Sequence, residues 1–228
     1  MNKVYLTGDL HANWDSRESF IRSLDESDIL IVLGDFGFNW SPLIFKTYLE
    51  NEPACKMLWV DGNHENFSYL NTFPIVDMYR GKCHKLSDKC YHLMRGEMFE
   101  IEGKKYFAFG GARSIDRIYR TPGLSWWPEE VPSKKEYAKA MNKLKVDNKY
   151  DYLLTHTGGS KDLLNLYPYQ DLFDDETGYM IDDINSLSKY KYHFLGHMHK
   201  YANFENTYCL YEEIWDVEKE EFVTLEKL

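Results

Sequence analysis

The chain has 228 residues, of which 43% are hydrophobic and 28% charged, proportions that exclude a disordered protein and suit one large α/β domain. Its formal net charge of -10 argues against extended nucleic-acid binding, which depends on Lys and Arg replacing counterions. The sequence contains no apolar run of about eighteen residues and no basic-then-apolar leader, so we expect a cytoplasmic protein without a membrane span.

Strand and helix signals alternate over the first 70 residues. Asp15-Ser16-Arg17-Glu18 predicts a capping box that opens a helix through Leu24, and Ser41-Pro42 predicts the start of a second helix. This alternation indicates a parallel sheet with helices on its faces. Short apolar runs predict the buried strands, at residues 4–6, 29–33 and 57–60.

The middle of the chain has a different pattern. Short apolar runs occupy residues 91–94, 98–101 and 105–109, and Glu102-Gly103 between the last two is typical of a hairpin turn. We therefore expect antiparallel strands here, in a second sheet or at the edge of a mixed one.

The second half contains two segments with little periodicity. Residues 111–132, with their Gly and Pro, predict a long loop that can form a rim or lid, and residues 157–180 predict another. Helices are expected at 133–145 and 181–188. The remaining apolar runs predict strands at 152–154, 192–195, 209–210, 214–215 and 222–223. Because no repeat or low-complexity linker separates these elements, we expect a single domain over residues 1–228.

Four cysteines and three histidines match no chemical motif. Cys55, Cys83, Cys90 and Cys209 lack paired spacing, so we expect reduced thiols. Ordinary surface or core roles are favoured for His84, His92 and His193.

Five short polar motifs each follow one of the predicted strands. In an open α/β sheet, the loops at the carboxyl ends of parallel strands converge on one crevice, so distant motifs can share a site there. We therefore expect one site built from Gly8-Asp9-Leu10-His11, Gly34-Asp35, Gly62-Asn63-His64-Glu65, Thr155-His156 and Gly196-His197-Met198-His199.

These motifs supply carboxylate, amide and imidazole ligands without thiolates, a set that suits Mn best and also Fe, Zn or Ni. Seven ligands can hold two divalent ions with open positions, and the two oxygens of Asp35 can bridge them. Two ions about 3.5 to 4 Å apart can clamp a phosphate ester and lower the pKa of bound water to about 7. We thus predict a bridging hydroxide as nucleophile and metal ligands Asp9, His11, Asp35, Asn63, His156, His197 and His199.

Other residues near the motifs are candidates for substrate chemistry. His64 directly follows a proposed ligand, so it can protonate a leaving alkoxide or stabilise phosphoryl charge. Arg113 and Arg117 can bind substrate phosphate bidentately, although a solvated or helix-pairing role is an equal alternative. Trp126 and Trp127 can stack on an aromatic leaving group, with packing inside the loop as the favoured alternative.

At these residues the chain resembles the calcineurin-like metallophosphoesterase superfamily, whose pattern is Asp-x-His, Gly-Asp, Gly-Asn-His-Asp/Glu, a lone His and Gly-His-x-His. All of these elements occur here in order between residues 9 and 199. The resemblance implies a four-layer αββα sandwich with two mixed sheets. It also implies two metal sites, one of Asp9, His11, Asp35 and His199, the other of Asp35, Asn63, His156 and His197.

One departure from this pattern bears on the substrate. Protein phosphatases of the superfamily carry an acidic residue and an Arg after Gly-Asp, whereas this chain has Phe36-Gly37-Phe38-Asn39-Trp40. We therefore predict a phosphoesterase acting on a small phosphorylated molecule. A phosphodiesterase or nuclease acting on nucleotides is the alternative, and a non-catalytic metal-binding scaffold is a hypothesis from another class.

Overall fold

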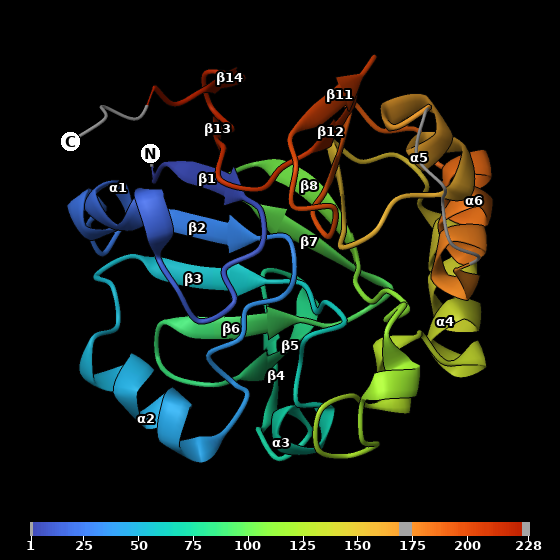
Figure 1. The fold of residues 1–228 in the computed structure, drawn as a ribbon. Coiled ribbons are helices and arrows are strands. Elements are labelled where there is room, and N and C mark those ends of the chain that lie inside the picture. The colour runs from blue at the N-terminus through green and yellow to red at the C-terminus, as the bar shows by residue number, and fades with distance from the viewer. Residues whose placement is uncertain (1, 169–174, 225–228) are drawn as a thin grey trace.

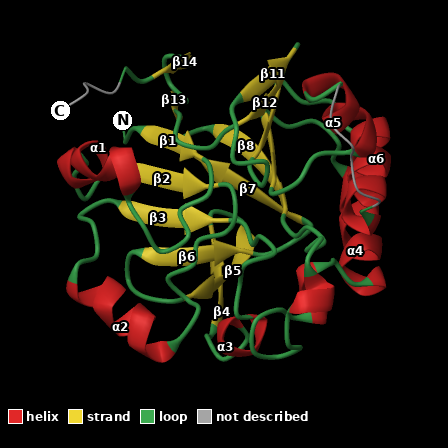
Figure 2. Ribbon diagram, in the orientation of Figure 1, coloured by secondary structure: helices red, strands yellow, loops and turns green. Residues whose placement is uncertain are grey.

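Two β-sheets pack face to face in the computed structural model, which describes residues 2–168 and 175–224, and helices cover both outer faces (Figure 1). Figure 2 shows the strands between the two groups of helices. This arrangement confirms the expected α/β fold with two mixed sheets in a four-layer αββα sandwich.

The first sheet has the strand order β14-β13-β1-β2-β3-β6-β5-β4. Its centre, β1 to β3 and β6, is parallel, while the strands at both edges run antiparallel. The bounds are β1 Val4–Thr7, β2 Ile29–Val32, β3 Lys56–Trp59, β4 Ile75–Met78, β5 Gly81–Lys85, β6 Cys90–Leu93, β13 Ile214–Asp216 and β14 Glu221–Phe222.

The second sheet has the order β11-β12-β10-β9-β8-β7. Strands β8, β9, β10 and β12 are parallel, and β7 and β11 pair antiparallel at the two edges. The bounds are β7 Glu97–Ile101, β8 Lys104–Phe109, β9 Tyr152–Thr155, β10 Tyr192–Leu195, β11 Ala202–Phe204 and β12 Thr207–Cys209.

The central strands are buried on both faces, which explains their continuous apolar runs. In β2, Ile29 and Ile31 pack between the sheets, and Leu30 and Val32 pack toward the helices, because successive side chains of a strand point to opposite faces. The expected strands in residues 4–6, 29–33, 57–60, 152–154 and 192–195 are thus confirmed.

Helices cover the outer face of each sheet. The first sheet carries α1 (Glu18–Ser23), preceded by the 3-10 turn η1 (Asp15–Arg17), with α2 (Pro42–Glu50) and α3 (Phe67–Leu70). The second carries α4 (Lys134–Val146) and α6 (Glu176–Leu187), which pack against β8 and β9, and α5 (Ser160–Leu166), which contacts β11.

Two of the predicted helix starts are correct. Ser41 caps α2 by accepting a hydrogen bond from the Ile44 backbone N–H, with Pro42 at the first helical position. A capping box between Ser133 and Glu136 opens α4, as its position predicted.

The helices expected through Leu24 and over 181–188 form as α1 and α6, but their starts differ from the prediction. The capping box at Asp15-Ser16-Arg17-Glu18 does not form, because Asp15 has a φ of 49° and its carboxylate pairs with Arg17 instead. The loop expected over 157–180 contains α5 and the first turn of α6, which therefore begins before residue 181; residues 169–174 lie outside the described chain. Burial of Leu163 and Leu166 against Leu195 stabilises α5, a tertiary contact with no local signal.

The remaining segments agree largely with expectation. The Glu102-Gly103 turn joins β7 to β8, residues 111–132 hold only the short turns η2 (Arg117–Tyr119) and η3 (Pro128–Glu130), and the tail forms closing strands.

All four cysteines are free and buried. Among residues 2–168 and 175–224, no helix combines the length and apolarity that crossing a bilayer requires.

Arg17 is a fully buried cation that joins three segments at the end of β1. Its guanidinium donates to the carbonyls of Tyr211 (2.6 Å) and Asp9 (2.8 Å) and to the Thr7 hydroxyl (3.1 Å). Burial lowers its pKa, and the nearby carboxylates of Asp15 and Asp9 oppose that change. The side chain therefore fixes the loop that carries Asp9.

We expect Arg17→Met to lower the free energy of unfolding by about 2–4 kcal/mol, because it leaves buried acceptors without donors. Urea unfolding followed by circular dichroism measures the change. Arg80→Met is the matched control, since Arg80 is exposed and its ion pair with Glu100 lies at the surface. Equal effects of the two substitutions would contradict the anchoring role of Arg17.

Candidate metal centre

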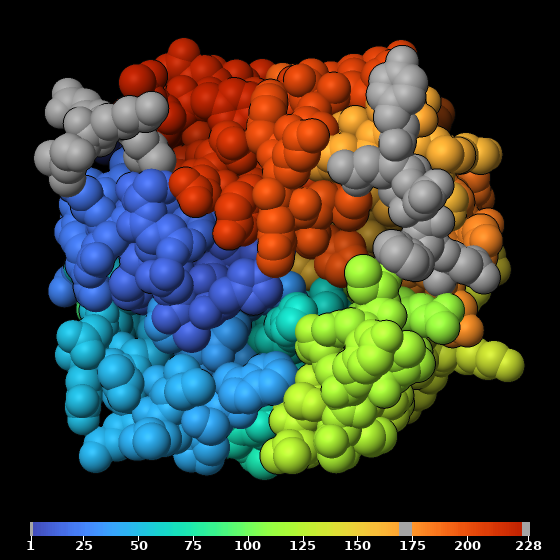
Figure 3. Space-filling view, in the orientation of Figure 1, coloured from blue at the N-terminus to red at the C-terminus, as the bar shows by residue number. Residues whose placement is uncertain are grey.

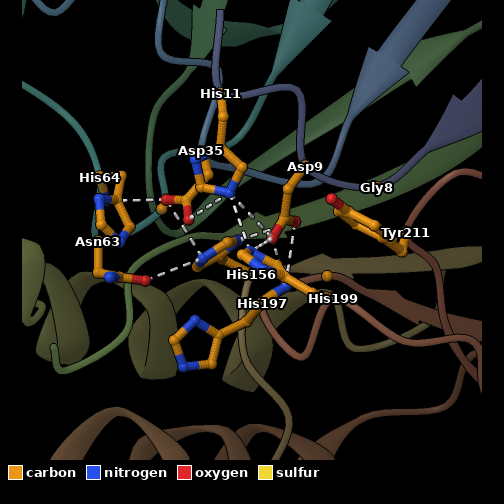
Figure 4. Close-up of polar contacts among 12 residues, drawn as sticks. Gly8, Asp9, His11, Asp35, Asn63, His64, His156, His197, His199 and Tyr211 are labelled. Atoms are coloured by element: carbon orange, nitrogen blue, oxygen red, sulfur yellow. Dashed lines mark hydrogen bonds and ion pairs between the residues drawn. The ribbon is translucent and has the colours of Figure 1, made fainter. Parts of the chain in front are cut away.

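The predicted ligands meet where the carboxyl ends of five parallel strands converge, on loops from both sheets (Figure 4). Asp9 and His11 follow β1, Asp35 follows β2 and Asn63 follows β3. His156 follows β9, and His197 and His199 follow β10. The backbone at His11, Asp35, His197 and His199 has positive φ, a costly conformation that clusters at functional sites.

The motif glycines make room for polar side chains from other motifs. A Cβ at Gly34 would collide with the His156 ring, one at Gly62 with the Asp35 carboxylate, and one at Gly196 with the Asp9 carboxylate. Each glycine thus permits close approach of a side chain that lies far away in sequence.

Four of the predicted ligands form a compact group. The ligand atoms of Asp9, His11, Asp35 and His199 all lie within 4.8 Å of one another. The Nε2 atoms of His11 and His199 are 2.9 Å apart, and His199 Nε2 is 3.1 Å from Asp9 Oδ2. Asp35 Oδ2 is buried, has no hydrogen-bond partner among the described residues and lies 3.6 Å from His11 Nε2. A divalent cation suits this donor set, because it would satisfy the buried oxygen and both nitrogens at once.

A second group lies on the other side of Asp35. His156 Nδ1 is 2.7 Å from the Leu33 carbonyl, so a neutral ring donates there and presents a lone pair at Nε2. That Nε2 faces two oxygen acceptors, Asn63 Oδ1 at 3.2 Å and Asp35 Oδ1 at 3.4 Å. Because the His156 Nε2 lone pair and the two oxygens face one another, a cation placed between them would satisfy all three acceptors.

The carboxylates and imidazoles of the site shift one another's pKa values. Burial opposes protonation of His156, but the Asp35 and Asp9 carboxylates outweigh it and raise the pKa of His156 to about 10. Burial likewise opposes ionisation of Asp35, yet the imidazoles of His156, His64 and His11 hold the pKa of that carboxyl well below its usual range.

His197 is near the second group but is oriented differently. Its backbone N–H donates to Asp9 Oδ1 at 3.0 Å, and its ring packs against the His156 ring at 4.9 Å between centroids. In Figure 4 this ring lies outside the network of polar contacts. Burial and the neighbouring His156 lower the pKa of His197 to about 4, which keeps its ring neutral, as ligation requires.

His64 lies beside the metal-ligand group and contacts an arginine that the sequence analysis missed. Its backbone N–H donates to Asp35 Oδ1 at 2.8 Å. Arg120 Nη1 and Nη2 each lie 3.2 Å from a ring nitrogen of His64. Burial lowers the pKa of His64, and the Arg120 charge adds to that effect while Asp35 opposes it.

The two arginines that were predicted to bind substrate phosphate, Arg113 and Arg117, make other contacts in and beside the 111–132 loop. Arg117 pairs with buried Glu130 (2.5 Å) and stacks over the Trp126 ring at 4.9 Å. Arg113 is exposed, and its backbone N–H donates to Asp175. Trp127 is buried and donates to Ser68 of α3, so it packs against the helices of the first sheet and not inside its own loop as expected.

A buried polar chain orients Asn63. Its Nδ2 donates to Ser114 Oγ (3.1 Å), and Ser114 Oγ donates to Glu130 Oε2 (2.8 Å). Because Asn63 Nδ2 must point toward Ser114 to donate this hydrogen bond, the amide is oriented with its Oδ1 toward His156. Glu130 is 0% exposed and also accepts from the Ser114 backbone. Neither Ser114 nor Glu130 belongs to a motif, so only the fold reveals them.

The non-motif histidines have core roles, as expected. Asp61, two residues before Asn63, accepts from Arg95 Nε (2.8 Å) and contacts His92 Nε2 (3.0 Å), and His92 Nδ1 contacts His84 Nδ1 (3.0 Å). Burial opposes ionisation of Asp61, but Arg95 and His92 hold its pKa well below the usual range. His193 is fully buried and contacts the Thr155 hydroxyl.

A comparison with known protein families gives a match over most of the chain. The profile of the family described as Calcineurin-like phosphoesterase matches residues 2–201. The chain is also similar to the crystal structure of phosphopantetheinyl hydrolase from Mycobacterium tuberculosis, with 17% identity, a TM-score of 0.43 and coverage of 92% of this chain and 88% of that one. No match was found among curated proteins.

Ser114→Ala should weaken the binding of Mn²⁺ by about 10- to 100-fold, because the Asn63 amide loses the partner that orients it. Isothermal titration of metal-free protein with MnCl₂ measures this change. Ser19→Ala, at an exposed position of α1, is the control and should bind as wild type. Unchanged affinity in Ser114→Ala would show that Asn63 is either held by other contacts or not a ligand.

Proposed function

The chain belongs to the calcineurin-like phosphoesterase family and is a metal-dependent phosphoric ester hydrolase, and from this premise we propose a dinuclear enzyme that hydrolyses phosphate esters of a small molecule. One ion would be held by Asp9, His11, Asp35 and His199, the other by Asp35, Asn63, His156 and His197. Manganese is the favoured ion. We also propose that residues 1–228 form one domain and that the protein is cytoplasmic.

The observation that carries this proposal is the orientation of the Asp35 carboxylate. Its Oδ2 faces His11, a member of the four-residue group, while its Oδ1 faces His156 of the second group. A carboxylate with one oxygen toward each ligand set is suited to bridge two cations. Bound divalent cations would supply Lewis-acid chemistry, lowering the pKa of water and neutralising charge on phosphoryl oxygens.

The chain's own groups account for the remaining steps. Water oxygen joins phosphorus as the bond from phosphorus to the alcohol oxygen breaks, and protonated His64 gives its proton to the departing oxygen. The proton that the water loses is released and restores the imidazolium of His64. Arg120 lies beside this proton donor, because its Nη1 and Nη2 are each 3.2 Å from a ring nitrogen of His64, and we propose it as a phosphoryl contact. Its Nε pairs with Asp116 at 2.8 Å, which holds the side chain in place.

The segment after Asp35 supports a small-molecule substrate. Phe36 and Phe38 are buried against the helices, and the Phe36 backbone N–H donates to buried Glu65 (2.9 Å). This segment thus offers no charged group to a phosphoprotein, and Arg120 reaches the site from a different loop.

A combined metal and activity measurement tests the proposal. Purified protein should bind two Mn²⁺ per chain by elemental analysis and hydrolyse an aryl phosphate monoester faster than the matched diester. Asp35→Asn should lose both metals and turnover, because it removes the shared charge, whereas Asp77→Asn at an exposed position should behave as wild type. A diester preference would favour the phosphodiesterase alternative, and an intact protein without metal or turnover would indicate a scaffold.

Replacement of His64 separates proton transfer from metal binding. His64→Asn should keep the Mn²⁺ content and lose about 10²- to 10⁴-fold in kcat, the usual contribution of a general acid. His11→Asn is the contrasting variant and should lose metal as well. If His64→Asn also lost its metal, His64 would be a metal ligand and not the general acid.

A further inference from the structure

Two cavities that the proposed mechanism does not use adjoin the site. The first, about 220 Å³, is lined by His11, Ala12, Gly37, Trp40, Ile44 and His64. The second, about 390 Å³, shares Ala12 and Ile44 with the first and extends between α1 and α2 to Arg22 and Asn51. Together they form a groove that begins at His64 and leads away from the metal ligands. Figure 3 shows the surface around these blue and light-blue segments, opposite the yellow-green 111–132 loop.

The walls of this groove are aromatic and held in place by other rings. Trp40 meets the Trp127 ring edge to face at 5.2 Å, and Trp127 is buried and anchored to Ser68. In the second cavity, Phe38 lies 4.7 Å from Trp14 and 4.9 Å from Tyr48. Such pre-positioned rings bind planar apolar groups with little loss of side-chain entropy.

We propose that this groove binds the alcohol portion of the substrate, and that the enzyme selects phosphate esters of elongated, ring-bearing, largely apolar alcohols. The inference rests on the proposed function, since it uses His64 as the proton donor to the departing oxygen. An alcohol oxygen placed at His64 leaves its carbon chain facing Trp40 and Ile44.

The charge distribution separates this groove from the phosphate subsite. Of the described residues that line the first cavity, none is Lys or Arg, so a phosphate group gains no cationic partner there. Arg120 contacts the His64 ring but does not line this cavity, and His11 is the one proposed metal ligand among the described residues of its lining. At the far end of the second cavity, Arg22 lies over the Trp14 ring at 5.6 Å, so the apolar part of the groove ends at a charged side chain.

Two esters with leaving alcohols of similar basicity test this preference. In the Mn²⁺ enzyme, 2-(2-naphthyl)ethyl phosphate should show a kcat/KM about tenfold or more above that of ethyl phosphate. The free alcohol, 2-(2-naphthyl)ethanol, should inhibit ethyl phosphate hydrolysis competitively. Equal kcat/KM for the two esters, or no inhibition by the alcohol, would overturn the inference while leaving the proposed function intact. Failure to hydrolyse either ester would count against the proposed function itself.

A matched pair of variants on α2 locates the effect. Ile44→Asn places an amide in the wall common to both cavities, while Leu43→Asn makes the same kind of change at an exposed neighbour outside them. Ile44→Asn should reduce the ratio of kcat/KM for the naphthyl ester to that for ethyl phosphate by about tenfold, and circular dichroism shows that the variant is folded. Leu43→Asn should alter neither. A naphthyl preference that persists in Ile44→Asn would overturn the assignment of this groove.

Discussion

The site depends on a buried carboxylate, that of Asp35, which several segments approach at once. Its backbone carbonyl accepts from the His11 N–H at 2.7 Å, and its side chain accepts from the His64 N–H at 2.8 Å. The same side chain faces imidazoles from both sheets. A buried charge in such a position is costly unless it is paired, so the loops that surround it are held to one arrangement. The glycines before Asp35, Asn63 and His197 follow from this crowding, because a Cβ there would occupy the space of a polar side chain from another motif.

Buried ion pairs and hydrogen bonds behind the ligands fix the same loops from the outside. Arg17 holds the loop after β1, Asp61 and Arg95 hold the loop after β3, and Glu130 orients Asn63 through Ser114. These groups contribute little net stability relative to apolar packing, but leaving any one of them unpaired is expensive. They therefore contribute mainly to the position of the ligands, which metal geometry requires to within fractions of an ångström.

The surroundings divide the site into regions of different chemistry. Carboxylates and imidazoles form the centre, Arg120 adds a guanidinium on one side of His64, and Trp40 and Ile44 add an apolar wall on another. His64 lies where the polar and apolar regions meet, which is where the ester bond would be placed.

From the sequence alone, the types of ligand in the proposed centre and most of the helices and strands could be predicted. Motif residues such as Asp9 and His156 lie directly after apolar runs, and the convergence of parallel strand ends brings such residues together whatever the details of the loops. The tertiary structure decided which residues support them. Ser114, Glu130 and Arg120 come from a loop without periodicity, and α5 forms because distant apolar residues bury it. Neither a local propensity nor a spacing encodes such contacts, since they depend on where a fold places segments that are far apart along the chain.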